Sequence, residues 1–117
     1  MSVKINFDNV SQREQAHRII RETAREISDH TNILETLFIL ENGKNRQDGF
    51  GYVEKNSPDL NIVKFYMSKD EFEKHLDILE SVTVDDLDFE DEINKKQLNI
   101  IVDKLHDVAK IMRKNII

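Results

Sequence analysis

An apolar repeat near the end of the chain constrains the fold most, because it requires a long amphipathic helix. The repeat alternates spacings of three and four residues, which places its members on one side of an α-helix. We expect this helix to span about 89–114 and to turn that side toward a core or a partner helix. The repeat consists of Leu98, Ile101, Leu105, Val108 and Met112, and Val102 and Ala109 widen it.

A second, narrower apolar stripe lies almost opposite the first on the same predicted helix. A rotation of about 100° per residue places Ile93, Ile100 and Ile111 there. A single sheet covers only one side of a helix. Either the preceding helix covers this stripe within one chain, or a second copy covers it and the protein is a homodimer.

Patterns near the N-terminus predict a strand followed by a helix. Val3, Ile5 and Phe7 alternate with polar residues, which suits a strand with one buried face. Ser11 and Glu14 have the spacing of a capping box, so a helix is expected over about 11–29.

Three strands and two further helices are expected in the rest of the chain. The apolar run within 33–41, the residues from Phe50 to Glu54 and the segment 60–67 predict strands, with a polar hairpin loop over 42–49. For the run within 33–41 a helix is the alternative. Ser68 and Glu71 form a second capping box and predict a helix start. The sequence therefore predicts one α+β domain over residues 1–117. It would have about four mostly antiparallel strands and three helices in the order β-α-β-β-β-α-α.

Composition excludes several classes of function. With 17 basic and 23 acidic residues the net charge is −6, which disfavours nucleic acid and anionic lipid as partners. The chain has no cysteine, so disulfides, thiolate zinc sites and cysteine nucleophiles are excluded. No apolar stretch is long enough for a membrane span or a signal peptide, and we expect a cytoplasmic protein that does not contact membranes.

No motif for catalysis, a cofactor or a metal is present. The chain lacks the glycine-rich phosphate loops and the nucleophile elbow, and nothing assembles an acid, a base and a nucleophile. Its histidines are not spaced as metal ligands and are expected to be ordinary core or surface residues. We therefore predict no enzyme activity, no cofactor and no metal. The histidines are His17, His30, His75 and His106.

A dense acidic run before the last predicted helix is the most polarised part of the sequence. As an acidic ridge it would steer association with a basic partner surface. The alternative is a structural preference, because acidic side chains stabilise the N-terminus of the helix that follows. The run consists of Asp85, Asp86, Asp88, Glu90, Asp91 and Glu92.

A modest basic set suggests a different use. Arg18, Arg21 and Arg25 share one side of the first predicted helix, although glutamates nearby dilute their field. Lys44 and Arg46 lie in the predicted hairpin loop, where exposure makes them available for contacts. Two copies of the chain would present such a set twice.

The leading hypothesis is a small, acidic, noncatalytic protein-binding module. It would be an inhibitor, an immunity-type protein or an adaptor that occludes a basic surface of its protein partner, steered there by the acidic ridge. One alternative is a homodimeric nucleic-acid-associated regulator that uses the arginine-rich helix face. Another is a small-ligand-binding domain with Tyr52, Tyr66 or a histidine at its pocket.

Overall fold

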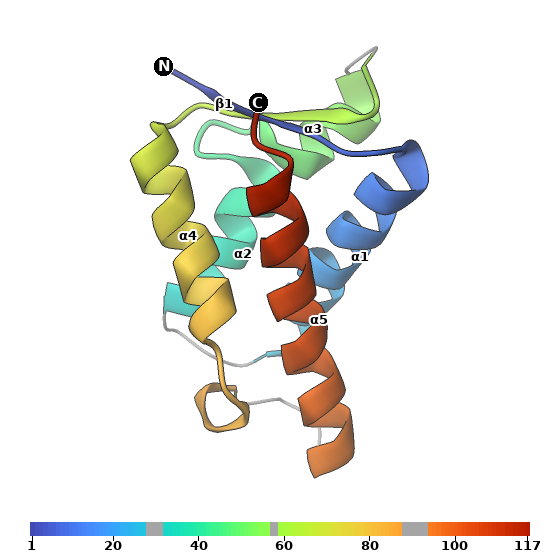
Figure 1. Ribbon diagram of the computed structural model, residues 1–117, viewed down its shortest axis with the longest axis vertical. Helices are drawn as coiled ribbons and strands as arrows, with labels where there is room; N and C mark the ends of the chain where they lie inside the picture. The colour runs from blue at the N-terminus through green and yellow to red at the C-terminus, as the bar shows by residue number, and fades with distance from the viewer. Residues whose placement is uncertain (28–31, 57–58, 88–93) are drawn as a thin grey trace.

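Helices make up most of the computed structural model, which describes residues 1–27, 32–56, 59–87 and 94–117 (Figure 1). The elements, in chain order, are β1 (Val3–Asn6), α1 (Val10–Glu26), α2 (Asn32–Asn42), α3 (Gly49–Asn56), β2 (Ile62–Phe65), α4 (Lys69–Ser81), the short 3-10 helix η1 (Val84–Asp86) and α5 (Lys95–Lys114). Helices α1, α2, α4 and α5 enclose the core, with α1 and α4 each packed against both α2 and α5. The sheet lies across one end of these helices, at the top of Figure 1.

The sheet is an antiparallel pair in which each strand has one buried and one outer face. Val3 pairs with Phe65 and Ile5 with Val63, and all four side chains are buried. The alternating positions point away from the core, as the period of two requires. The strands predicted near Val3 and within 60–67 are thus confirmed.

The prediction of about four strands and three helices is wrong. Residues 33–41 belong to α2 and the segment from Phe50 to Glu54 belongs to α3, so β1 and β2 are the strands within the described residues. A solid apolar run fits a buried helix as well as a buried strand. In α2 the buried positions Ile33, Leu37 and Leu40 follow helical spacing. The segment 42–49 consequently connects the end of α2 to the start of α3 and is not a hairpin loop.

Helix ends agree with the sequence in one case and shift in others. Ser68 caps α4 as predicted, and its hydroxyl accepts a hydrogen bond from the Glu71 amide at 3.1 Å. Helix α1 begins earlier than predicted, because Asn9 and not Ser11 caps it, and it ends at Glu26. Asn94 caps α5. The predicted start of that helix, near 89, lies outside the described residues.

The apolar repeat of α5 faces the core, as predicted. Leu105, Val108 and Met112 are buried, whereas Leu98 and Ile101, nearer the start of the helix, are half-buried. Together with Val102 and Ala109 the repeat forms the contact of α5 with the other helices. None of the helices within the described ranges combines the length and the apolar character that crossing a membrane requires.

Gly43 is required where the chain leaves α2. Its φ is +67°, and a Cβ added there would lie 1.5 Å from Oδ1 of Asp48. Asp48 is buried, and its other carboxylate oxygen accepts a hydrogen bond from the backbone amide of Tyr66 at 2.5 Å. The connection between α2 and α3 is therefore anchored to the end of β2.

We predict that Gly43→Ala lowers the free energy of unfolding by about 1–3 kcal/mol, because the left-handed backbone is unfavourable for alanine and Asp48 must move. Urea denaturation measures the change. Gly51→Ala is the comparison, since Gly51 lies within α3, is not in the left-handed region, and an added Cβ there would lie 3.2 Å from the Glu41 carbonyl oxygen, a far milder contact than at Gly43. Equal effects at the two glycines would contradict this account of Gly43.

Candidate anion-binding face

Most of the acidic run cannot be placed, since Asp88, Glu90, Asp91 and Glu92 lie outside the described residues. Asp85 and Asp86 are exposed in η1. Asp86 uses its carboxylate locally, accepting hydrogen bonds of 2.9 Å from the amide and from the hydroxyl of Thr83. The acidic ridge as a partner surface stays a prediction.

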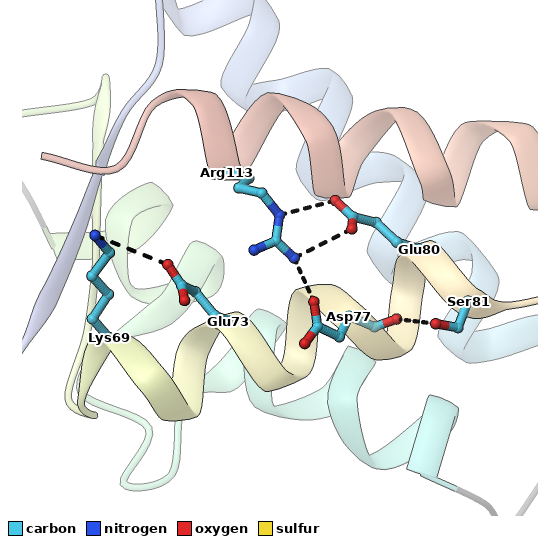
Figure 2. A network of polar contacts seen from close by, with 6 residues as sticks. All are labelled: Lys69, Glu73, Asp77, Glu80, Ser81 and Arg113. Carbon is cyan, nitrogen blue, oxygen red and sulfur yellow. Dashed lines mark hydrogen bonds and ion pairs between the residues drawn. The ribbon is translucent and has the colours of Figure 1, made fainter.

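Arg113 neutralises two acidic residues of α4 that are distant from it in the sequence. Its guanidinium, on α5, donates to Asp77 Oδ1 at 2.7 Å and to Glu80 Oε1 at 3.1 Å on α4 (Figure 2). The hydrogen bonds that Arg113 donates to Glu80 and Asp77 raise the pKa of Arg113 and outweigh the opposing effect of burial. The acidic character of α4 is thus weaker than the sequence suggests.

The predicted apolar stripe on α5 divides in the structure. Ile100 is 47% exposed, whereas Ile111 is partly buried against the core. Ile93 lies outside the described residues. Ile100 thus remains available to a second copy or another partner, and Ile111 is largely covered within the chain.

The arginines of α1 do not act as one uniform set. Arg18 and Arg25 are exposed, but Arg21 is half-buried and close enough to Glu54 on α3 to influence its ionisation. Lys44, in the loop after α2, forms an ion pair with Glu71 on α4. The hydrogen bond from Lys44 is the main reason why the pKa of Glu71 lies below its ordinary value.

A polar cluster that the sequence did not reveal joins α1, α2 and α3. Arg13 and His17 of α1 are 3% and 2% exposed. Both contact Oε1 of Glu54, Arg13 through Nη1 at 3.2 Å and His17 through Nδ1 at 2.7 Å. His17 also stacks on Phe50, and its Nε2 lies 3.7 Å from Oε1 of Glu41.

The charges around Glu54 favour its ionised form. Partial burial acts to raise its pKa, but the hydrogen bond and charge of His17, with the charges of Arg13 and Arg21, together lower the pKa below its ordinary value. Neither nitrogen of His17 is open to a ligand, because the side chain is buried. The cluster therefore serves as a connection between helices.

The remaining described histidines also have structural partners. His75 Nδ1 lies 3.0 Å from the Thr36 hydroxyl, and His106 Nε2 lies 2.8 Å from the Val82 carbonyl oxygen. Burial lowers the pKa of His75 despite the opposing effect of Glu71. His30 lies outside the described residues. Across the described part of the chain, no three His, Cys, Asp or Glu side chains converge as a metal site.

The outward side of α3 carries polar and aromatic groups. Phe50 and Val53 are buried, and Glu54 turns toward Arg13 and His17. At about 100° per residue, this places Tyr52 and Lys55 on the opposite side of the helix. Both are exposed. Together with Asn42, Arg46, Gly51 and Asn56 they line a hollow of about 260 Å³.

The outer face of β2 continues this surface. Val63 and Phe65 point to the core, so Lys64 and Tyr66 lie on the other face. Lys64 Nζ lies 4.3 Å from the centroid of the Tyr66 ring and 3.0 Å from its hydroxyl. Lys64, Tyr66 and Tyr52 line an adjoining hollow of about 200 Å³, together with Gln47, Gly49, Val53 and Ile62.

A third hollow, on α2, adjoins the first. It has a volume of about 670 Å³ and shares Asn42 and Arg46 with the hollow beside α3. Phe38, which is 48% exposed, contributes the largest exposed apolar side chain there. Among the described residues, the exposed aromatic side chains Phe38, Tyr52 and Tyr66 therefore all line these three hollows.

We call the surface of the two smaller hollows, with the neighbouring outer face of β1, the cationic-aromatic face. None of the described residues that line those two hollows is acidic. Its cations have no carboxylate partner within the described part of the chain, and on an acidic protein such a concentration of positive charge can bind an anion. The face comprises Lys4, Arg46, Tyr52, Lys55, Lys64 and Tyr66.

The sequence identified only part of this face. Arg46 and the two tyrosines were named, each for a separate hypothesis, whereas Lys4, Lys55 and Lys64 were missed. Lys55 joins Tyr52 only because 49–56 is a helix, and Lys4 meets Lys64 only through the sheet register. Reading Phe50 and Val53 as a helical pair would have revealed the partnership of Tyr52 and Lys55.

Comparisons with known proteins give no match to a protein-family model, to a curated protein or to a solved structure.

Glu54→Gln is predicted to lower the free energy of unfolding at pH 7 by about 1–3 kcal/mol, because buried Arg13 loses its carboxylate partner and the contact with buried His17 is weakened. The pKa of Glu54 is lowered in the folded protein, so its contribution is present above the ordinary value of 4.5 and is lost as the pH falls through the folded pKa. Urea denaturation at a series of pH values measures the free energy of unfolding of both proteins. The difference between variant and parent should become smaller as the pH falls. Glu22→Gln, at an exposed position on α1, is the control, and a gap independent of pH would argue against the ionic role.

For the apolar stripe, Ile100→Ser is expected to shift any dimer toward the monomer while leaving stability nearly unchanged, because Ile100 is 47% exposed. Sedimentation velocity over a concentration series measures the oligomeric state. Ile111→Ser should instead lower stability. If the parent protein sediments as a monomer at every concentration, the hypothesis of self-association through Ile100 is wrong.

Proposed function

We propose that the protein is a noncatalytic binding module that holds an anionic chain molecule on the cationic-aromatic face. The observation that carries the proposal is a set of cations, Arg46, Lys55 and Lys64, that have no carboxylate partner among the described residues. They surround hollows with no acidic lining residue among those described. The sequence suggested a binding module with an acidic contact surface and a basic partner. The proposal keeps the class of function and changes the contact surface and the charge of the partner.

Electrostatics supports a multivalent anion as the partner. One exposed ion pair contributes little, about 0–1 kcal/mol. Several cations along one surface act together on a chain of negative charges, because each contact releases counterions or adds Coulomb energy. The tyrosines add contact area that a simple ion would not use.

The surface is also fixed in place by the fold. Asp48 binds the Tyr66 amide and so ties the loop that carries Arg46 to β2. Helix α3 is anchored by buried Phe50 and by the pair of His17 and Glu54. The backbone that carries these groups is therefore in place before binding, which favours affinity.

A basic protein partner for the acidic run remains a second prediction. Within the described residues, the exposed members of the run are Asp85 and Asp86 on η1, and Ile100 on α5 is an exposed apolar side chain that such a partner could contact. This surface is distinct from the cationic-aromatic face, because η1 lies at the opposite end of the molecule from the sheet (Figure 1).

The proposed function predicts that Lys55→Glu weakens binding of a fluorescent anionic chain by about tenfold or more, through loss of one contact and added repulsion. Fluorescence anisotropy measures binding of two probes, an oligo-dT of about 20 nucleotides and a polyglutamate peptide of similar length. At least one probe should bind at about 50 mM salt and bind more weakly at about 200 mM.

Lys110→Glu is the matched control, because Lys110 is exposed on α5 and the charge change is the same. It should reduce binding far less than Lys55→Glu. Failure of both probes to bind at low salt, or equal effects of the two substitutions, would falsify the proposed function.

A further inference from the structure

We infer that the anionic chain held by the cationic-aromatic face is single-stranded nucleic acid, an inference that rests on the proposed function. Two observations lead to it beyond the net positive charge of the face. The first is the pairing of each exposed tyrosine with a neighbouring cation. The second is a pair of lysines opposed across the sheet.

Tyr52 and Tyr66 are placed to stack on unpaired bases. They are 37% and 42% exposed, and both line the hollow between α3 and β2. Lys55 shares the neighbouring hollow with Tyr52, while Lys64 lies over the Tyr66 ring. Each aromatic side chain thus has a cation beside it. This combination suits a nucleotide, which carries a planar base and a phosphate on the same unit.

Lys4 and Lys64 form a like-charged pair that calls for an anion. They are directly opposite each other in the sheet register, on the face away from the core. Like charges at directly opposed positions destabilise an antiparallel pair. A phosphate bound at this position would relieve the repulsion and would extend the contact surface from α3 onto the sheet.

The form of the ligand follows from the aromatic groups. In a duplex the bases are stacked on one another, so exposed tyrosines on a protein surface have no base face to contact. A single strand offers such faces, and stacking tolerates any base. An acidic peptide would satisfy the cations but has no planar groups in register with its charges. The described residues therefore favour a single strand over both.

The backbone of Arg46, on the cationic-aromatic face, has an unfavourable conformation. Its φ is +61°, a left-handed conformation that is uncommon for residues other than glycine. Glycine adopts the same backbone without penalty. Arg46→Gly therefore removes the cation without adding backbone strain, and we expect the variant to fold as the parent does.

The test measures binding of oligo-dT, a duplex of the same length and polyglutamate to the full chain by fluorescence anisotropy over a salt series. We expect oligo-dT to bind more tightly than the other two. Tyr52→Ala and Tyr66→Ala should each weaken oligo-dT binding about tenfold, within the range found for base stacking. Arg46→Gly should weaken it and reduce the slope of log affinity against log salt by about 0.7. Thermal melting confirms that each variant is folded.

Tyr52→Phe keeps the ring and should bind oligo-dT nearly as well as the parent, which separates stacking from a hydroxyl contact. Preference for polyglutamate, or for the duplex, overturns the inference while leaving the proposed function in place. Equal binding of oligo-dT by the parent and by Tyr52→Ala and Tyr66→Ala also overturns it. If no probe binds, the proposed function fails as well.

Discussion

Phe50 is the contact on which the exposed surface of the protein depends. Its ring is fully buried and lies 5.7 Å from the ring of Phe7 and 5.4 Å from that of His17, measured between centroids. An α-helix turns about 100° per residue, so the inward direction of the Phe50 side chain fixes the directions of all other side chains in α3. Tyr52 and Lys55 are turned to solvent as a result. Packing of the core therefore decides where the anion-binding groups are displayed.

A polar contact holds the same helix from its inner edge. Arg13 and His17 are buried, and burial of such groups is costly unless each has a partner. Glu54 supplies that partner for both, so the pairing requires α3 to stay against α1. Helix α3 has only two turns and would be marginal alone. The apolar and polar anchors together make it a rigid support for Tyr52 and Lys55.

Local signals in the sequence were sufficient where one residue pattern had one structural meaning. The alternation of Val3 and Ile5 identified β1, Ser68 identified the start of α4, and the apolar repeat identified α5. The run from Leu37 to Leu40 has no such unique meaning, because four consecutive apolar residues fit a buried strand or a buried helix. That ambiguity turned α2 into a strand in the prediction, whereas α3 became a strand because Phe50, Tyr52 and Glu54 were read as alternating positions on one strand face.

The prediction of a strand from Phe50 to Glu54 hid most of the candidate site. As a strand, the segment from Phe50 to Glu54 would place Tyr52 on the same face as Phe50, whereas the helix places the two on opposite sides. Arg13 and Glu54 are 41 positions apart in sequence, and Lys4 and Lys64 meet only through strand register. A net charge of −6 also argued against an anionic partner. Charges are screened over about 8 Å at physiological ionic strength, however, and the molecule extends 40 Å along its longest axis, with the sheet and η1 at opposite ends. The charges within one screening length of the contact surface, and not the total, therefore decide which partner this surface attracts.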